Sequence, residues 1–506
     1  MNRRNLLAAL LMTFACALTI AAQSPAAATS TAPATGQTAR PASTQTLAIV
    51  NNQQITLADL PPELRTNIEN LDKDVADVRR RILDLQIGQI LLAAEAKKRG
   101  VTTEQLVKTE ISSKVTNPTD AEIKNIYETN RNYFGTADLA QAQPVIIQQV
   151  RNQRGQQLLD EYLATLRKTY PVVMGADVNA PNLTPTTTLA TVAGQTISAS
   201  AINDDQRIKR YIYEIRMQTY DAERQAVEVK INNLLLEAEA KRRNTTSEAL
   251  LKTEVADKVT HPTDADVTRF YEENKARMNG AELQTVRADI ITYLEQPSRE
   301  KLEQALVDRL RAGAQIRLML TEPESLVEKV SVDDDPSRGS ASAPVTVIEF
   351  TDFQCPACRA IHPALDELLK TYADRVRFVV RDFPLEQHQQ ARKAAEAANA
   401  ANAQGKFFEY AALLFKNQEA LDIASLKKYA AELGLDQARF NTALDGGTYA
   451  AEVQKDVADG EEVGVDSTPT IFINGVRQRD LSPEGLRAGV ERALTKAGKP
   501  PARTTK

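Results

Sequence analysis

An internal duplication constrains the fold of this chain more than any other feature of its sequence. Thr46–Thr56 (TLAIVNNQQIT) matches Thr188–Ser198 (TLATVAGQTIS), 142 residues later. Leu91–Arg99 (LLAAEAKKR) matches Leu235–Arg243 (LLEAEAKRR) at an offset of 144 residues. Solenoid repeats recur every ~20–50 residues, so this longer offset indicates that a whole domain has been duplicated.

Each copy, over residues 46–175 or 188–322, is predicted to be mainly α-helical. Its first long helix ends in basic residues and a cap, Lys97–Arg99 followed by Gly100 in the first copy. Basic side chains suit the negative end of the helix dipole, and glycine suits a left-handed cap. Apolar residues of this helix recur at three-four spacing, which places them on one face: Val75, Val78, Ile82, Leu85 and Leu92.

Two further helices and one strand are predicted in each copy. The strands, Leu47–Val50 and Leu189–Val192, open the copies, and we expect each to pair within its own copy. Acidic or amide residues follow threonine at spacings near those of a capping box, which marks helix starts. These pairs are Thr102 with Gln105, Thr119 with Glu122, Thr245 with Glu248 and Thr263 with Asp264.

The two copies resemble the N-terminal helical region of SurA-like periplasmic chaperones and related peptidyl-prolyl isomerases. The resemblance rests on the opening strand and turn, the EAEAKKRG-type helix end, and the stretches NPTDAEIKNIYETN and HPTDADVTRFYEEN, over residues 46–320. In that family an isomerase domain often follows the third helix. Only about ten residues separate Phe134 from a helix expected near Pro144, so no isomerase domain fits here.

The resemblance implies a helical unit with an apolar groove, either for unfolded chains or for pairing with another copy. An inert spacer or dimerisation arm is the alternative. No residue of either copy has the pattern of a catalytic group. Aromatic side chains could line such a groove, although core packing is the preferred interpretation for them: Tyr127, Tyr133, Phe270 and Tyr271.

The N-terminal segment has the pattern of a secretory signal peptide over residues 1–22. Arg3 and Arg4 precede an apolar stretch, Leu6–Ile20, that is too short to span a bilayer comfortably, and Ala21 and Ala22 follow it. A retained membrane anchor is the alternative. Thr13 stands where a lipoprotein signal has an aliphatic residue, which argues against lipid attachment at Cys16. Residues 23–45, rich in Ala, Thr and Pro, predict a disordered linker, and residues 498–506 a disordered tail.

Charge and hydropathy exclude two broad classes of function. The 62 basic and 67 acidic residues give a net charge of −5, which does not favour a nucleic-acid partner. A mean hydropathy of −0.37 excludes a multispanning membrane protein. The function must therefore come from local motifs.

A close pair of cysteines, Cys355 and Cys358, is all that remains after signal cleavage. Val345–Phe350 (VTVIEF) predicts a buried strand, and Pro356 favours the first turn of a helix, which makes Cys355 its N-cap. The helix N-terminus favours the thiolate of Cys355, and Cys358 lies one turn on. Half a zinc site or a structural disulfide are alternatives, but the mature chain has no second cysteine pair to complete four zinc ligands.

Glu349 is a carboxyl residue in an otherwise apolar strand, six residues before Cys355. Burial would raise its pKa and suit it to accept the proton of Cys358. The alternative is a solvent-facing position at a sheet edge.

A second segment, Val465–Thr470 (VDSTPT), precedes the apolar run Ile471–Ile473 and an Asn-Gly turn. A proline is tolerated at the start of a strand. A cis Thr468–Pro469 bond would leave the backbone of Thr468 available to an extended peptide; an ordinary trans proline in a loop is the alternative.

These segments together resemble the DsbA family of thioredoxin-fold proteins, over residues 330–497. The residues that carry the resemblance are EFTDFQCPACR, VDSTPTIFING, the helical middle Lys393–Phe415 and the second strand Phe378–Arg381. By position it implies a nucleophile at Cys355, a resolving cysteine at Cys358, a buried acid at Glu349, a cis-proline at Pro469 and a substrate-backbone contact at Thr468. Well-known members have Pro-His between the cysteines, where this chain has Pro356-Ala357.

The sequence thus predicts a multidomain chain: two mainly α-helical SurA-like repeats followed by an α/β thioredoxin fold with a helical insertion. We expect an exported protein thiol:disulfide oxidoreductase, an oxidant, that needs no cofactor besides the Cys355–Cys358 disulfide. Expected partners are unfolded or cysteine-containing clients and a membrane or soluble redox partner, and not nucleic acid. A reductase or isomerase of the same fold, or a non-enzymatic periplasmic chaperone, are the alternatives. His362 is expected to be a surface or packing residue, and His388 has no evident role.

Overall fold

The computed structural model describes residues 44–278 and 280–498. The predicted signal peptide with Cys16, residues 23–43 of the predicted linker and the tail beyond residue 498 lie outside this part. The chain is multidomain and mostly helical, and it divides into two compact units. Unit 1 holds the residues up to Asn203 together with Gln218–Thr321; unit 2 holds Asp204–Met217 and the residues from Glu322 onward.

Unit 1 contains the two copies apart from Asp204–Met217 of the second copy, and both copies have the same order of elements. The first copy consists of β1 (Thr46–Val50), β2 (Gln53–Thr56), the 3-10 helix η2 (Leu57–Asp59), α2 (Pro62–Arg99), α3 (Thr103–Glu110), η3 (Ser112–Lys114), α4 (Asp120–Thr129), α5 (Arg131–Phe134), α6 (Leu139–Thr169) and β3 (Val172–Met174). The second consists of β4 (Thr188–Val192), β5 (Gln195–Ser198), α7 (Ala199–Asn203), α8 (Gln206–Arg242), α9 (Ser247–Glu254), η4 (Ala256–Lys258), α10 (Asp264–Asn274), η5 (Lys275–Arg277), α11 (Leu283–Ala312) and β6 (Ile316–Leu318).

Local capping chemistry sets most helix ends where the sequence predicts them. Gly100 ends α2 with a φ of 66°, in the left-handed conformation. Thr102 and Thr119 cap α3 and α4 in capping boxes. Two predictions are wrong in detail: α9 is capped by Thr246, one residue beyond Thr245, and the box of Thr263 is closed by Asp266 rather than Asp264.

The helix expected near Pro144 begins earlier. Asp138 caps α6, its side chain accepting a hydrogen bond from the Gln141 N–H at 2.9 Å, and Pro144 lies inside the first turns. Pro144 is the sixth residue of α6, beyond the N–H groups that a helix start leaves unpaired, so it removes one intrahelical hydrogen bond.

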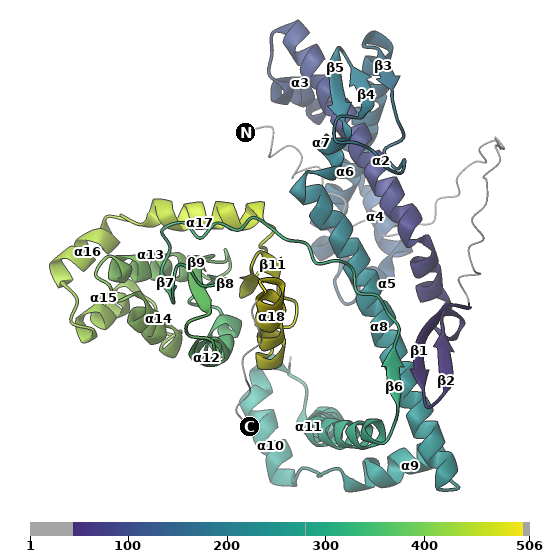
Figure 1. Ribbon diagram of the computed structural model, residues 1–506, viewed down its shortest axis with the longest axis vertical. Helices are drawn as coiled ribbons and strands as arrows, with labels where there is room; N and C mark the ends of the chain where they lie inside the picture. Colours follow the sequence, from purple (N-terminus) through teal and green to yellow (C-terminus); the bar gives the residue numbers. More distant parts are fainter. Residues whose placement is uncertain (1–43, 279, 499–506) are drawn as a thin grey trace. The chain divides into compact units, whose positions relative to one another are not determined.

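The two copies exchange strands, which corrects the prediction that each opening strand pairs only within its own copy. β1 does pair with β2, but its other edge pairs with β6, the last strand of the second copy. Reciprocally, β4 pairs with β5 and with β3, the last strand of the first copy. Figure 1 shows β6 beside β1 and β2, and β3 beside β4 and β5. Each three-stranded sheet therefore needs both copies.

The long helices make the same exchange. Apolar residues of α8, in the second copy, pack on the hairpin of the first copy in one buried cluster: Leu47, Ala48, Val50, Ile55, Leu57, Leu60, Val227, Ile231 and Leu235. In turn α2 lies against β4, β5 and α7. Since neither hairpin is covered by its own copy alone, the two copies form one folding unit.

The aromatic residues considered for a groove fall into two groups. Tyr127 and Tyr271 are buried in equivalent small cores, each donating a hydrogen bond to a backbone carbonyl, at 2.8 and 2.9 Å. Phe270 is partly buried and lies against Tyr293, whereas Tyr133 is exposed. Core packing therefore accounts for two of the four.

Unit 2 is an α/β domain built on a five-stranded sheet in the order β11-β10-β8-β9-β7. β8 and β9 are parallel, and the other neighbours are antiparallel. Its elements are β7 (Ser337–Arg338), β8 (Val345–Thr351), α12 (Pro356–Thr371), β9 (Val376–Asp382), α13 (Ala391–Asn402), α14 (Phe407–Lys416), α15 (Ile423–Glu432), α16 (Gln437–Asp445), α17 (Ala450–Glu462), β10 (Thr470–Ile473), β11 (Val476–Arg477) and α18 (Pro483–Lys496).

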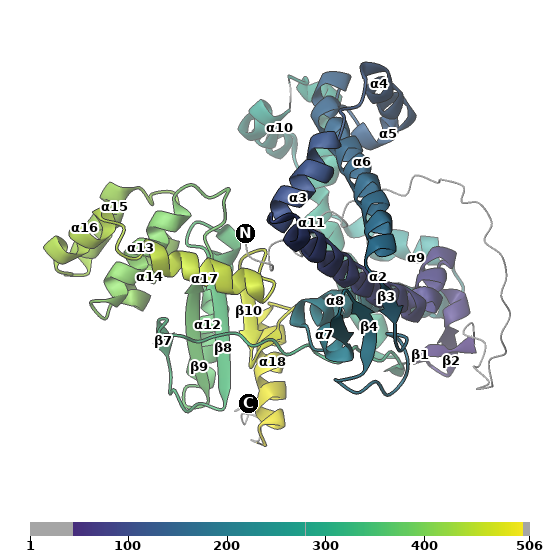
Figure 2. The same ribbon diagram turned by 90° about the horizontal axis from the view of Figure 1, so that it is seen from above.

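Two apolar clusters cover the two faces of this sheet. Val347, Phe378 and Ile471 face the larger cluster with α12, α13, α14 and α18, and Ile348, Phe350 and Val379 face the smaller one. α13–α16 form one group, and α17 leads from it back to the sheet (Figure 2). The predicted Asn474–Gly475 turn joins β10 to β11, and both of its residues have positive φ. The middle strand β8 is buried on both faces.

The shared core of unit 1 yields a test. Ile231 on α8 is fully buried against the hairpin of the other copy, so Ile231→Ala should lower the free energy of unfolding of unit 1 by about 2–5 kcal/mol. Val229→Ala, on the same helix at a 54% exposed position, should change it by less than about 0.5 kcal/mol. Urea unfolding followed by far-UV circular dichroism measures both. Equal effects would contradict the exchanged packing.

Candidate active site

The loop between β8 and α12 places Cys355 at a helix N-terminus. α12 begins at Pro356, and Cys355 is its N-cap with an extended backbone, φ −75° and ψ 122°. The apolar run that ends in Thr351 holds the loop at one end of the middle strand, and Pro356 fits the first turn because its missing N–H would have no partner there. The N–H groups of this first turn lack intrahelical partners and lie at the end of α12 where Cys355 stands.

The two cysteines are free thiols in different surroundings. Cys355 keeps 6% of its surface exposed, whereas Cys358, one turn into α12, keeps none. Burial raises the pKa of the Cys358 thiol far above its ordinary value, and the nearby Glu349 raises it further. Cys355 is therefore the sulfur that a second molecule can reach, and Cys358 is held as a neutral thiol.

Glu349 lies on β8 and has no exposed surface. Since β8 is the middle strand, the alternative of a solvent-facing residue at a sheet edge is wrong. Burial raises the pKa of its carboxyl to about 8, and the Thr351 hydroxyl lowers it only in part. Neither carboxyl oxygen has a hydrogen-bond partner among the described residues. The carboxyl is protonated at neutral pH.

The Thr468–Pro469 peptide bond is cis, and it lies beside Cys355. The Cys355 thiol donates a hydrogen bond to the Thr468 carbonyl, with 3.4 Å between Sγ and the oxygen. The structure thus places the five predicted site residues in two groups: Cys355 beside the Thr468–Pro469 segment, and Cys358 near Glu349.

Glutamine side chains that the sequence did not single out fix the active-site loop. Gln418, between α14 and α15, donates from Nε2 to the carbonyls of Phe353 at 3.0 Å and Cys355 at 2.8 Å, and it is 6% exposed. Gln390 N–H donates to Gln354 Oε1 at 2.9 Å. The helical insertion therefore holds the cysteine loop in place. Nothing local in the sequence points to Gln418, which lies 63 residues from Cys355.

His388 also has a place that the sequence did not reveal. Its Nδ1 lies 2.7 Å from Oδ2 of Asp352, a buried carboxylate that also accepts hydrogen bonds from the N–H groups of Gln354 and Leu385. Asp352 begins the loop that leads to Cys355, so His388 supports that loop. His362 instead stacks on Phe415, with 4.3 Å between ring centres, and burial lowers its pKa. It is a packing residue, in line with the sequence.

A cluster of carboxyl groups surrounds the buried guanidinium of Arg381 at the same end of the sheet. Arg381 pairs with Asp335 at 2.9 Å, with Asp459 at 2.8 Å and with Asp456. Asp335, Glu452 and Asp456 lie close enough together to hold a cation. Because Arg381 already balances two of these three carboxyls, the cluster is better explained as an internal ion-pair network than as a metal site.

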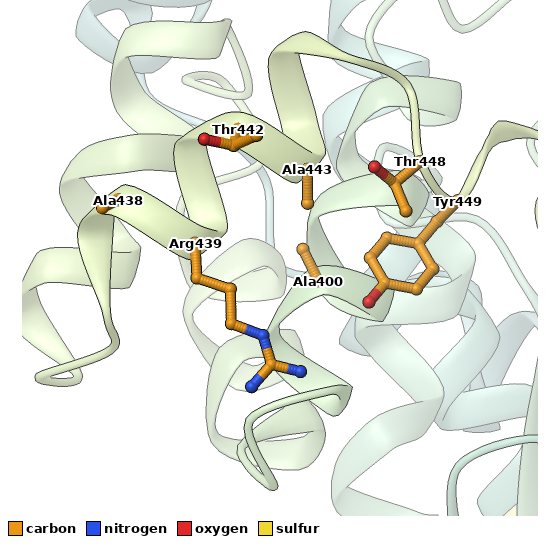
Figure 3. Close-up of a pocket in the computed structure, with 7 residues that line it drawn as sticks. All are labelled: Ala400, Ala438, Arg439, Thr442, Ala443, Thr448 and Tyr449. Atoms are coloured by element: carbon orange, nitrogen blue, oxygen red, sulfur yellow. The ribbon is translucent and has the colours of Figure 1, made fainter.

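A cavity of about 400 Å³ lies apart from the cysteines, between α13, α16 and the segment before α17. Arg439 and Tyr449 border it, with the small side chains of Ala400 and Ala443 between them (Figure 3). The other lining residues are Ala438, Thr442 and Thr448. None of the predicted site residues faces this cavity.

Burial of Glu349 predicts a pH dependence of stability. Its pKa is about 8 in the folded protein against 4.5 for the ordinary group, so the folded state binds the extra proton between these values. Stability from this group is full below pH ~4.5 and is lost as pH rises through about 8. Glu349→Gln should remove this loss, which we expect to be of the order of a few kcal/mol.

Urea unfolding of the reduced protein at pH 5 and pH 8 measures the effect. Glu367→Gln, at an exposed position of α12, is the matched control and should keep the wild-type pH dependence. If the free energy of unfolding had the same pH dependence in wild type and Glu349→Gln, the raised pKa of Glu349 would be contradicted.

Comparison with known proteins supports the fold of unit 2. Residues 331–492 match the family model described as Thioredoxin. The protein named Na(+)/H(+) antiporter NhaA 3 from Salinispora tropica is 39% identical over 197 residues, which are 38% of this chain and 30% of that protein. The chain thus spans less than a third of that relative's length. Within residues 44–278 and 280–498, no helix is both long and apolar enough to span a membrane.

Solved structures that resemble the chain each cover about a third of it. Oxidised BdbD from Bacillus subtilis is 23% identical and covers 34% of this chain and 100% of its own, with a TM-score of 0.32. A thioredoxin-like oxidoreductase from Silicibacter pomeroyi is 27% identical and covers 32% of this chain and 94% of its own, with a TM-score of 0.30. The family match and the observed sheet establish that residues 331–492 form a thioredoxin-like domain, a domain type of thiol–disulfide oxidoreductases.

Proposed function

We propose that this protein is an exported thiol:disulfide oxidoreductase that oxidises cysteine pairs in client proteins, as DsbA-like proteins do. The observation that carries the proposal is the pairing of Cys355, a helix N-cap thiol beside the Thr468 carbonyl, with the fully buried Cys358. One sulfur is placed to meet a client and the other to close or open a disulfide with it.

The reaction begins from the Cys355–Cys358 disulfide. A client thiolate attacks Cys355 Sγ, the disulfide breaks, and the bonding pair leaves on Cys358. Glu349, protonated at neutral pH, gives its proton to the Cys358 sulfur. A second client thiolate then attacks the client sulfur of the mixed disulfide and releases the Cys355 thiolate. The client gains a disulfide, and the protein is left as the dithiol.

Two features support the oxidising direction. Cys355 is the N-cap of α12, a position that in general suits a thiolate, and a thiol–disulfide protein is a strong oxidant when its reduced form is stabilised. A protonated Glu349 is ready to donate when the disulfide opens. Return to the disulfide requires an electron acceptor, for which we propose a membrane-bound or soluble redox partner. A reductase or isomerase would have the same site with a lower reduction potential.

The helical copies of unit 1 are proposed to hold unfolded clients for the dithiol, as their likeness to SurA-like chaperones implies. Both copies expose large apolar side chains: Tyr133, Val145, Val173 and Met174 in the first, and Tyr293, Leu318 and Met319 in the second. Such residues can bind apolar segments of unfolded chains. Holding a client on the same chain raises the effective concentration of its cysteines. Export by the predicted signal peptide would bring the protein to such clients.

Exchange through Cys355 predicts a trapped intermediate. Cys358→Ser leaves a mixed disulfide without its resolving sulfur, so clients should stay linked to Cys355. Cys355→Ser is the matched control and should trap none, because Cys358 is buried. Non-reducing electrophoresis with a reduced unfolded client and oxidised glutathione measures the adducts. Equal trapping by both variants, or by neither, would contradict the proposed reaction and favour a non-enzymatic chaperone.

Client holding is tested by removing residues 46–320. The shortened protein should oxidise a short dicysteine peptide at the rate of the full chain, but a large unfolded client at least several-fold more slowly. Far-UV circular dichroism and the reactivity of Cys355 show whether its remaining domain is folded. An unchanged rate with the large client would count against client holding and leave the dithiol chemistry intact.

A further inference from the structure

Four oxygen atoms behind Cys358 are buried without a hydrogen-bond partner in the described part of the chain. They are Oε1 and Oε2 of Glu349, Oγ1 of Thr351 and Oδ1 of Asp382. Buried polar atoms are paired in the great majority of cases, so a group of orphans in one place calls for an explanation. Stability does not provide one, because each unpaired buried oxygen costs about 1–3 kcal/mol.

The register of the sheet puts these residues side by side. Glu349 and Thr351 are two positions apart on β8 and point to the same face. Asp382 on the parallel strand β9 is the direct partner of Thr351. The face is that of Cys358, because Val347 and Val380, from the same alternating sets, lie in the cluster that contains Cys358. Thr351 therefore stands between the two carboxyl groups.

The Thr351 hydroxyl is close to both groups that exchange a proton in the proposed reaction. The Thr351 hydroxyl lowers the pKa of Glu349 and that of Cys358, although it has no hydrogen-bond partner of its own among the described residues. A hydroxyl can accept one proton while it donates another. On the neighbouring strand its direct partner is Asp382, whose Oδ1, like the Thr351 hydroxyl, has no hydrogen-bond partner among the described residues.

Asp382 is set up to hold a proton near neutral pH. It is 4% exposed, and burial, followed by the charge of Asp456, raises its pKa to about 7. Asn399 of α13 donates to its Oδ2 at 2.6 Å. The other charged groups that act on it are Arg381 on β9, Glu452 on α17 and Asp335 in the segment before β7. The Asp382 N–H donates to Asp456 at 2.8 Å, which ties the end of β9 to α17.

The acidic groups become more exposed from Glu349 towards Glu452. Glu349 has no exposed surface, so a proton that it gives away must come back through neighbouring groups. Exposure increases along the acids, from none at Glu349 to 4% at Asp382 and to partial exposure at Glu452. Asp382 is thus the intermediate member between the buried site and water.

We propose that Asp382, acting through the Thr351 hydroxyl, is a second proton station that restores the proton of Glu349 during disulfide exchange. The inference rests on the proposed function. When the disulfide opens, the proton of Glu349 moves to the Cys358 sulfur. The Thr351 hydroxyl then passes a proton to the Glu349 carboxylate and takes one from Asp382, which regains its own from solvent. No electron moves in this relay.

The relay matters because disulfide opening would reverse if Glu349 stayed deprotonated. Its buried carboxylate, beside the new Cys358 thiol, takes the proton back, and the thiolate then re-forms the disulfide. Opening is therefore productive only once Glu349 is protonated again. A purely structural Asp382 would have no effect on this rate beyond its effect on folding.

The test compares Asp382→Asn, Thr351→Val and wild type as full chains. The oxidised proteins are mixed with reduced glutathione between pH 5 and 9, and the appearance of the Cys358 thiol is followed by acid quench, alkylation and mass spectrometry. Each variant should open about 10- to 100-fold more slowly at pH 7, at or below the lower end of the gain from a positioned proton donor. Each should also lose the pH dependence set by Asp382. The double variant should be no slower than the slower single variant.

Asp459→Asn is the matched control, since it removes a carboxylate from Arg381 on the other face of the sheet and should keep the wild-type rate. Alkylation of Cys355 in the reduced proteins should be the same in all variants. A wild-type pH profile in Asp382→Asn, or additive effects in the double variant, would overturn the relay.

A measurement on the unmodified protein covers the case of misfolded variants. The infrared difference between oxidised and reduced wild type should contain a carboxylic-acid band that responds to pH near 7, from Asp382. A difference spectrum without such a band would overturn the relay. Failure of the wild type to exchange disulfides even with glutathione would overturn both proposals, whereas exchange with glutathione but not with protein clients would overturn the client function alone.

Discussion

Desolvation of one carboxyl group governs the chemistry of unit 2. Glu349 lies on a strand with neighbours on both sides, so its side chain cannot turn to water. The groups that set its pKa include no cation, and only the Thr351 hydroxyl opposes the effect of burial. A neutral Glu349 next to a neutral Cys358 is the stable arrangement, and it suits a site whose leaving sulfur must be protonated in the interior. The dithiol, the sheet and the helix that covers it are arranged around this condition.

Unit 1 solves a different problem, that of covering a small sheet. A two-stranded hairpin is only marginally stable alone, and each copy by itself offers a hairpin with an uncovered edge and face. Exchange of β3 and β6 supplies the missing edge, and α2 and α8 supply the missing face. The two copies on one chain therefore supply each other with the edge strand and the covering helix, and no second molecule is required. This explains why the duplication retains the opening strand and the long helix in both copies.

Local patterns in the sequence predicted the helices, strands and turns. They did not predict which segments far apart in the chain contact each other. Features that depend only on neighbouring residues could be predicted from the sequence. Examples are the cap at Gly100, the N-cap at Cys355 and the Asn474–Gly475 turn. The cap of α9 was misplaced because Thr245 has Glu248 at capping-box spacing, whereas Thr246 caps the helix without such a partner, its third residue being Ala249. Strand exchange and the contacts of Gln418 join segments tens of residues apart or more, and no periodicity encodes them. The signal peptide, the likeness to SurA-like chaperones and the roles of the site residues stay predictions.

No charged residue lies between the two cysteines, so the electrostatic field at Cys355 must be set by groups outside the CPAC motif. Pro356 and Ala357 carry no group that could stabilise a thiolate, so the field at Cys355 comes from the peptide dipoles of α12 and from the groups that fix its first turn. The Cys355 carbonyl accepts hydrogen bonds from the Arg359 N–H at 3.3 Å and from Gln418 at 2.8 Å, and both bonds fix the first turn of α12. At the other sulfur, Glu349 can supply only one proton at a time. How strongly this dithiol oxidises should therefore depend on residues of the helical insertion and of β9, which lie outside the CPAC motif.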